Sequence, residues 1–183
     1  RTPAVIQEQL AEYYGLITHL DAEVGRILNA LAQSDHADNT YVIYAADHGL
    51  ALGSHGLLGK QSVYEHSQQS PLIIVGPDVP HGETTAFTYL LDLVPTISRL
   101  ANISPLDAVD GHDLSGLWHG TQDSIRDSLF LAYRDVARAV RDDRYKLIRY
   151  PQIDHTQLFD LQTDPDELHN LANDGAHTER ITA

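Results

Sequence analysis

The sequence has 183 residues, of which 42% are hydrophobic, and its 26 acidic and 12 basic side chains give a formal net charge of −14. A chain of this kind can bury a sizeable core, and its acidity disfavours contacts with nucleic-acid phosphates, which need Lys and Arg. No apolar run reaches the roughly 18 residues of a membrane span. The absence of cysteine excludes disulfides, Cys-based zinc sites and a Cys nucleophile from this stretch, but it leaves the cellular compartment undetermined.

The first predicted elements are a long helix and a buried strand. Between Pro3 and Ala32, apolar residues recur every three or four positions, which is typical of one face of an amphipathic helix. The run from Thr40 to Ala46 is β-branched and aromatic without alternation, as in a strand of a parallel sheet that is covered on both faces. The order helix, turn and buried strand predicts the α/β fold class.

A long irregular segment separates this strand from a second one. Residues 47–70 show no sustained period and are rich in Gly, His and Ser, and a loop this long is usually functional or disordered. Residues 71–75 form the second predicted strand, which we place in the same sheet as the first. Residues 90–102 predict a helix, in which Pro95 is tolerated because it lies in the first turn.

The pattern of predicted elements changes near residue 124. Four short strand candidates follow, separated by Asp-rich turns, at residues 128–133, 136–140, 145–150 and 157–161. Closely spaced strands with short turns predict an antiparallel meander. We therefore expect an α/β portion in residues 1–123 and a small antiparallel β subdomain in residues 124–183.

The residues that indicate chemistry lie where the first predicted strand ends. Asp47 and His48 follow that strand directly, and ligands of open α/β sheets bind outside the carboxyl ends of the strands. A carboxylate and an imidazole at this edge are natural ligands of a divalent cation. Lys60, further along the Gly-rich loop, can bring a positive charge to an anion that bridges to the metal.

A simpler interpretation is that Asp-His-Gly only ends a strand, with Asp closing the turn and Gly adopting a positive φ. The Gly-His-Gly and Gly-Lys sequences that follow favour a functional loop, because a plain turn has no use for so long an irregular segment. His66 is interpreted as a structural residue that fixes the loop to the sheet.

The central motif reads Asp47-His48-Gly49-x₃-Gly53-x-His55-Gly56-x₃-Lys60-x₃-Tyr64-Glu65-x₅-Pro71-Leu72-Ile73. Three further motifs lie at residues 13–26, 89–97 and 157–171. Together the four segments resemble the signature regions of the type I sulfatases, which belong to the alkaline phosphatase superfamily. Each motif alone is weak, but all four occur in the family's order and cover nearly the whole chain.

The resemblance implies a fold and a site. The fold is an alkaline-phosphatase-like mixed or parallel sheet flanked by helices, the C-terminal portion of the sulfatase catalytic domain, followed by the small antiparallel sheet. Asp47 and His48 match a pair of calcium ligands, and Lys60 matches a lysine that contacts the sulfate oxygens. His55 lies at a position that varies in the family and is a candidate for the substrate pocket. The expected substrate is a sulfated small molecule or a sulfated glycan.

The sequence departs from the family pattern in one respect. The family's nucleophile is a formylglycine made from a Cys or Ser that is followed by x-Pro-x-Arg, and neither form of that motif is present. The family's N-terminal Asp-Asp ligand pair is also absent, and the chain contains no Met. We therefore expect a fragment whose partner is the upstream part of the same protein, and which is inactive alone.

Two alternatives stay open at this point. A phosphonate monoester hydrolase or phosphodiesterase of the same superfamily can share the formylglycine, the Asp-His pair and the lysine. A non-enzymatic module derived from a sulfatase would keep the fold without the reaction.

Overall fold

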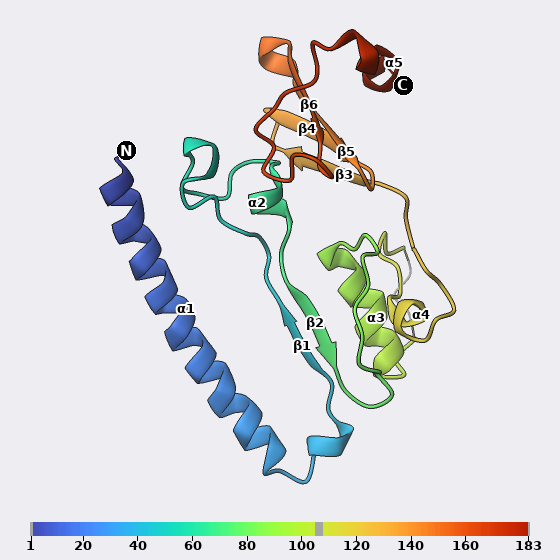
Figure 1. Ribbon diagram of the computed structural model, residues 1–183. Coiled ribbons are helices and arrows are strands. Elements are labelled where there is room, and N and C mark those ends of the chain that lie inside the picture. The colour runs from blue at the N-terminus through green and yellow to red at the C-terminus, as the bar shows by residue number, and fades with distance from the viewer. Residues whose placement is uncertain (1, 105–107, 183) are drawn as a thin grey trace. The chain divides into compact units, whose positions relative to one another are not determined.

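The chain divides into two structural units (Figure 1). The computed structural model describes residues 2–104 and 108–182. The first unit comprises Arg1–Gln61 and His66–Asp78, and the second comprises Ser62–Glu65 and Val79–Ala183. The chain therefore leaves the first unit at Ser62, returns to it at His66, and enters the second unit again at Val79.

The long helix α1 (Pro3–Ala32) opens the first unit, as the sequence predicts. Its first residue is a proline, whose fixed φ suits the first helical position, and Thr2 before it is extended. No residue of α1 is buried, and apolar side chains such as Leu16 and Ile27 are 67% and 69% exposed. Along the described part of the chain, no helix is both long and apolar enough to cross a membrane.

After the short turn η1 (Ala37–Asn39), strands β1 (Val42–Ala45) and β2 (Leu72–Val75) pair with each other. The two strands share a sheet, as predicted, but they run antiparallel, so the parallel orientation expected for this pair is wrong. The reason is that a continuous apolar run indicates burial on both faces but carries no information about the direction of the neighbouring strand.

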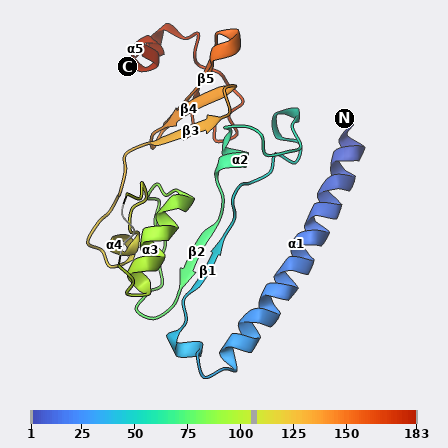
Figure 2. The ribbon, with the colours of Figure 1, turned by 180° about the vertical axis from the view of Figure 1, so that it is seen from behind.

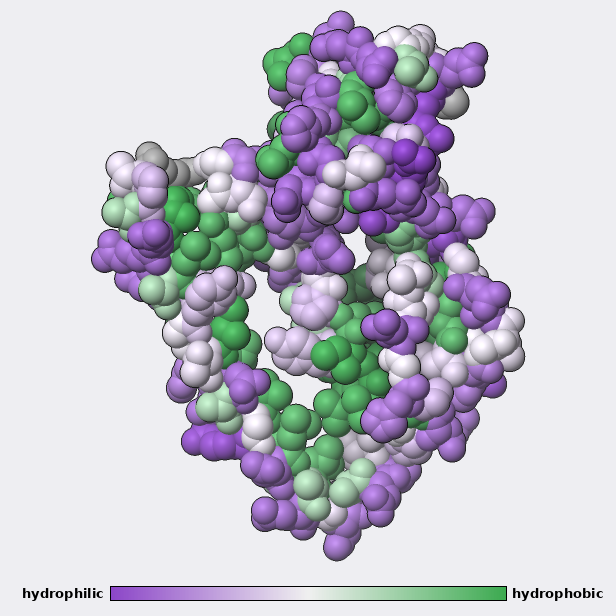
Figure 3. Space-filling model, viewed as in Figure 1, coloured by the Kyte–Doolittle hydropathy of each residue, from purple (hydrophilic) through white to green (hydrophobic). Residues whose placement is uncertain are grey.

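Apolar surface remains uncovered in the first unit. On β2, Ile73 and Val75 are 55% and 59% exposed, and Tyr44 on β1 is 41% exposed. Hydrophobic side chains are visible at the molecular surface in Figure 3. The apolar runs that predicted buried strands are therefore present as strands, but none of the residues of β1 or β2 is fully buried: each is half-buried or exposed.

Between Val79 and the C-terminal sheet, the second unit contains short helical elements. The predicted helix at residues 90–102 forms as the 3₁₀ turn η3 (Leu90–Asp92) followed by α3 (Leu93–Leu100), and α4 (Ser115–Trp118) comes next. Pro95 lies in the first turn of α3, where no intrahelical partner for its missing N–H is needed.

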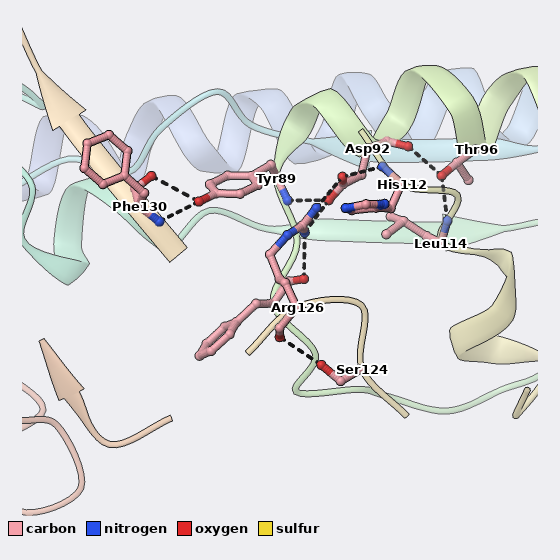
Figure 4. Close-up of polar contacts among 9 residues, drawn as sticks. Tyr89, Asp92, Thr96, His112, Leu114, Ser124, Arg126 and Phe130 are labelled. Atoms are coloured by element: carbon pink, nitrogen blue, oxygen red, sulfur yellow. Dashed lines mark hydrogen bonds and ion pairs between the residues drawn. The ribbon is translucent and has the colours of Figure 1, made fainter. Parts of the chain in front are cut away.

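A buried carboxylate holds these elements together (Figure 4). Asp92 is fully buried and accepts hydrogen bonds from the amides of Tyr89 at 2.6 Å and His112 at 2.9 Å. Both of its oxygens also accept a hydrogen bond from the Arg126 guanidinium, each at 2.7 Å. Burial opposes the ionisation of Asp92, but the bonds from Arg126 and from the two amides outweigh it and hold the pKa of Asp92 below its usual value.

The remainder of the second unit is an antiparallel sheet, seen from both sides in Figures 1 and 2. Its strands are neighbours in sequence order: β3 (Leu129–Tyr133), β4 (Ala137–Arg141), β5 (Tyr145–Tyr150) and β6 (His155–Asp160). The chain then closes with η5 (Gly175–His177) and α5 (Thr178–Thr182), and the turn η4 (Pro151–Ile153) joins β5 to β6. The predicted antiparallel meander is confirmed, while the domain boundary at residue 124 stays a prediction.

One face of this sheet carries the core of the second unit. Burial alternates along β4 and β5, as expected for strands with one covered face. The core cluster contains Ala137, Ala139, Ile148 and Phe159, together with Val63 from the separate segment Ser62–Glu65. Val63 is only 1% exposed, so this short segment is an integral part of the core.

Candidate functional site

Asp47 lies two residues beyond the end of β1, at the start of the irregular loop. Its carboxylate accepts a hydrogen bond from the Lys60 ammonium at 2.6 Å, although thirteen positions separate the two residues. The Asp47 side chain is 73% exposed and that of Lys60 is 40% exposed. The hydrogen bond and the positive charge of Lys60 hold the pKa of Asp47 below its usual value, so Asp47 is an anion near neutral pH.

His48 is oriented by the backbone of a neighbouring segment. Its Nδ1 lies 2.9 Å from the Ser67 carbonyl oxygen, which also accepts a hydrogen bond from the Gly49 amide at 3.0 Å. Because a carbonyl only accepts, Nδ1 carries the proton in this arrangement, and Nε2 keeps the lone pair that binds a metal.

Gly49 permits this close approach of two backbone segments. A Cβ at this position would lie 2.1 Å from the His66 carbonyl oxygen, a distance that no side chain tolerates. The loop segment after β1 and the segment that begins with α2 (Glu65–Gln68) therefore run in direct contact. The glycine of the Asp-His-Gly motif is therefore required by packing, whereas the positive φ that a simple turn would give Gly49 is not found.

The Gly-rich part of the loop forms a closed turn around η2 (Ser54–Gly56). Gly53 and Gly56 have φ angles of 110° and 69°, and His55 between them also has a positive φ of 53°. The turn is closed by a hydrogen bond from the Gly53 amide to the Leu57 carbonyl at 2.7 Å. The His55 ring packs against the His66 ring, with centroids 5.5 Å apart. Glycine is the residue that adopts such angles without strain, which explains the Gly-x-His-Gly spacing.

The three site residues predicted from the sequence thus belong to one loop system of the first unit. Asp47 and Lys60 are in direct contact, and His48 is the next residue after Asp47. Within residues 2–104 and 108–182, no three His, Asp or Glu side chains gather closely enough to hold a metal ion. Asp47 and His48 offer one carboxylate and one imidazole nitrogen, which fit a divalent cation but supply few of the 6–8 oxygen ligands that calcium takes.

Sequence reasoning did not identify the contribution of Ser67. Its carbonyl orients His48, and a backbone acceptor leaves no signal in the residue type. Sequence reasoning also treated Tyr64 and Glu65 only as part of the motif. Both belong to the second unit: the Tyr64 hydroxyl donates a hydrogen bond to Gln157 at 2.9 Å, and Glu65 lies 2.9 Å from the Lys146 ammonium.

Two protein-family models match the chain. The sulfatase model matches residues 2–103, and the model of the C-terminal region of N-sulphoglucosamine sulphohydrolase matches residues 53–183. The fold and the loop are those of a part of an alkaline-phosphatase-like domain. The chain belongs to the sulfatase family.

Individual relatives agree with this assignment. The chain is 35% identical over 169 residues to a choline-sulfatase of Rhizobium meliloti (strain 1021), covering 87% of the chain and 32% of the relative. It is 33% identical over 179 residues to an arylsulfatase of Clostridium perfringens, covering 93% and 37%. The chain therefore spans about a third of the length of these curated relatives.

A solved structure shows the same fold in a different hydrolase. The phosphonate monoester hydrolase from Silicibacter pomeroyi superposes with a TM-score of 0.88 at 30% identity, covering 99% of this chain and 40% of that chain. Sulfatases and phosphonate hydrolases thus share the architecture found here, and the fold alone does not separate their substrates.

Proposed function

We propose that this chain supplies part of the active site of a sulfatase that hydrolyses sulfate esters. Asp47 and His48 are the proposed ligands of a calcium ion, and Lys60 is the proposed contact to the sulfate oxygens. The observation that carries the proposal is the direct pairing of Lys60 with Asp47 on the loop that also holds His48. The proposal is supported because these three residues belong to one loop system of the first unit.

Each residue has a distinct task in this proposal. Asp47 keeps its negative charge because its pKa is lowered, so it offers a carboxylate oxygen to the cation without competition from a proton. His48 offers Nε2, because its Nδ1 is engaged by the Ser67 carbonyl. When calcium is bound, it supplies positive charge that neutralises the sulfate group.

Lys60 is the residue of this loop that acts on the developing charge. Hydrolysis breaks the bond between sulfur and the ester oxygen, and negative charge grows on the departing oxygen. A positioned ammonium stabilises that charge more than it stabilises the neutral bond, which lowers the barrier. The nucleophile is expected from sequence outside these residues, since Cys or Ser followed by x-Pro-x-Arg does not occur here.

The remainder of the protein is also the proposed partner of the exposed apolar surface. The strands β1 and β2 and the helix α1 expose large hydrophobic side chains that a further sheet or helix layer would bury. We expect the upstream part of the same protein to cover them.

A phosphonate monoester hydrolase is the second candidate function. The structural similarity to the Silicibacter pomeroyi enzyme favours it, because it extends over 99% of this chain. Assays of the full-length protein on an aryl sulfate and on the matching aryl phosphonate separate the two. A larger kcat/KM on the sulfate supports a sulfatase, a larger value on the phosphonate supports the alternative, and activity on neither supports a non-enzymatic module.

The assignment of Lys60 is tested by Lys60→Ala in the full-length enzyme. We expect kcat and kcat/KM on the preferred ester to fall together by about 10²–10³-fold, the loss typical of one electrostatic donor in a transition state. The control is Arg26→Ala, which removes an exposed cation of the same unit that pairs with Glu23 on α1. A Lys60→Ala enzyme with wild-type kcat/KM would refute the assignment.

A further inference from the structure

The four-stranded sheet of the second unit ends in two edge strands, β3 and β6. Among the described residues, each of them has a partner strand on one side only, so its other side turns backbone N–H and C=O groups outward. Such an edge is a template on which a further strand can pair, including a strand from another copy of the same protein. The question is therefore which groups occupy these two edges.

At the β3 edge, one side chain occupies the outward groups of Phe130 (Figure 4). The Tyr89 hydroxyl accepts a hydrogen bond from the Phe130 amide at 2.7 Å and donates one to the Phe130 carbonyl at 3.0 Å. In an antiparallel pair, a residue of the neighbouring strand would exchange two bonds with these same groups. A single hydroxyl thus takes the place that a residue of a further strand would fill.

The position of Tyr89 is determined by a network that does not include β3. Its backbone amide donates a hydrogen bond to the buried Asp92 carboxylate at 2.6 Å. Its ring lies under the Arg126 guanidinium, whose carbon is 4.6 Å from the ring centroid, within the range of a cation–π interaction. Arg126 is itself held by Asp92 and by the Phe87 carbonyl at 2.9 Å. The hydroxyl is therefore presented to the strand by groups that are already fixed.

The opposite edge is also covered by a side chain. The Asn170 amide group accepts a hydrogen bond from the Leu158 amide at 3.0 Å and donates one to the Thr156 carbonyl at 3.2 Å. The Leu171 amide adds a bond to the Leu158 carbonyl at 2.8 Å. Three hydrogen bonds thus cover two residues of β6, whereas the two bonds of Tyr89 cover one residue of β3.

The sequence of β3 makes this edge the more hazardous one. Residues 128–133 read Ser-Leu-Phe-Leu-Ala-Tyr, without charge, proline or glycine, whereas β4, β5 and β6 each contain charged residues. Uncharged segments of about six residues with high β-propensity are those that pair with copies of themselves. Phe130 is 59% exposed, and its cross-strand neighbour Val140 is 47% exposed, so apolar surface lies beside the edge.

We propose that Tyr89 protects the β3 edge: its hydroxyl occupies the outward groups of Phe130 and so prevents β3 of a second copy of this protein from pairing there. Two identical edges pair about a two-fold axis, so each copy supplies the same surface. Both copies would first have to give up their Tyr89 bonds, which makes the pairing less favourable. Ala132, two residues on, turns the same backbone groups outward and provides the rest of the edge. The proposal does not depend on the proposed function, because it involves no residue of the candidate site.

The first test asks whether the hydroxyl is what occupies Phe130. Tyr89→Phe in the full-length protein removes the hydroxyl and keeps the ring over Arg126. We expect hydrogen exchange at the Phe130 amide to accelerate about tenfold or more, because that amide loses its partner. The matched control is Tyr133→Phe, which removes a hydroxyl from β3 itself and should leave this exchange rate unchanged. An unchanged rate in Tyr89→Phe overturns the proposal.

The second test measures self-association by sedimentation over a series of protein concentrations. Tyr89→Ala, which removes the hydroxyl and the ring, should associate at a concentration at least about tenfold lower than wild type, the factor that corresponds to about one net hydrogen bond. Tyr89→Phe should lie between the two. The control is Tyr133→Ala, which loosens packing against the core of the same sheet and leaves Tyr89 in place.

Two results of this measurement contradict the proposal. Association of Tyr133→Ala to the same extent as Tyr89→Ala would show that a loosened fold, and not an open edge, causes it. Wild-type association of both Tyr89 variants would show that the edge needs no protection. If Tyr89→Ala does not fold, Tyr89→Phe is compared with wild type and with Tyr133→Phe by the same criterion.

The third test identifies the surface through which the copies pair. Ala132→Pro, added to the associating Tyr89 variant, removes an outward N–H from the edge without removing a bond to β4, and should restore wild-type association. Val140→Lys places a charge on the exposed face of β4, away from the edge, and should not restore it. Failure of Ala132→Pro, or equal restoration by Val140→Lys, overturns pairing along β3. If the proline variant does not fold, Phe130→Lys replaces it, because a charged side chain on an edge strand opposes pairing.

Discussion

Two carboxylate–cation pairs of the molecule have nearly the same geometry and opposite surroundings. Asp47 and Lys60 are 2.6 Å apart, and Asp92 and Arg126 are 2.7 Å apart. The Asp47 side chain is 73% exposed, whereas that of Asp92 is fully buried and also accepts two backbone hydrogen bonds. The distance between the charged atoms is therefore nearly the same in the exposed candidate site and in the buried structural pair. The two pairs differ in the burial of the carboxylate and in the number of hydrogen bonds that it accepts.

The comparison predicts its largest effect on stability at the buried pair. Arg126→Met leaves Asp92 buried without its cation, which typically destabilises a fold by about 3–5 kcal/mol. Denaturant unfolding of the full-length protein measures this loss, and kcat/KM per folded molecule is expected to be unchanged. A loss below about 1 kcal/mol would show that the two pairs are energetically alike.

The next effect concerns the backbone that supports the exposed pair. Gly49→Ala forces a Cβ to within 2.1 Å of the His66 carbonyl, so the two segments must separate. We expect a destabilisation of about 1–3 kcal/mol, as for other overpacked positions, and a higher calcium concentration for half-maximal activity. The control is Gly15→Ala in α1, where, apart from the adjoining helix backbone, no described atom lies within 4 Å of the new Cβ and where Ala favours the helix by about 0.5–1 kcal/mol. Equal melting temperatures for the Gly49 variant and wild type would contradict the packing argument.

The pH dependence of the free energy of unfolding provides a further test of the buried pair. Because the pKa of Asp92 is lowered on folding, its contribution to stability is present above the pKa of about 3.9 that it has when unfolded, and it disappears as pH falls through the folded value. We expect the free energy of unfolding to decrease below about pH 4 and to decrease less steeply in Asp92→Asn. Parallel curves for the two proteins would show that another group dominates acid unfolding.

The smallest effect on stability is expected at the exposed pair. Asp47→Asn removes the charge that Lys60 faces, but both side chains remain solvated, so the melting temperature should stay near the wild-type value. The calcium concentration that gives half-maximal activity should rise instead, because an amide oxygen carries no charge. A large fall in melting temperature without a change in calcium requirement would reverse the assignment of the two pairs.

Sequence reasoning predicted elements well where local periodicity decides them. The helix α1 and the four-stranded meander follow directly from apolar spacing and from short Asp-rich turns. The orientation of β1 against β2 did not follow, because strand direction depends on chain path rather than on residue pattern. The sequence predicted Asp47, His48 and Lys60 as candidate site residues from their residue types and spacing. The proximity of Lys60 to Asp47 could also be expected from the motif.

The supporting contacts of the site were beyond sequence reasoning for a physical reason. The Ser67 carbonyl is a backbone group, and any residue offers one. The same holds inside the second unit: Lys146 lies in a segment whose pattern predicts a strand and no more, and its partners Glu65 and Glu167 are 81 and 21 positions away. Nothing in the local sequence of β5 indicates that this lysine points into the core rather than into solvent.

The bond between the Glu65 amide and Glu167 spans 102 positions of the chain. During synthesis, the residues around Lys60 leave the ribosome long before Glu167 exists, so the segment that they flank cannot take its final place until almost the whole chain has been made. Contacts of such long sequence separation form late, because the entropy of closing the intervening loop must be overcome first. The second unit is therefore expected to complete its core as one of the last events of folding, and proteins shortened near the C-terminus should lose the place of residues 62–65 in that core even where their helices and strands have formed.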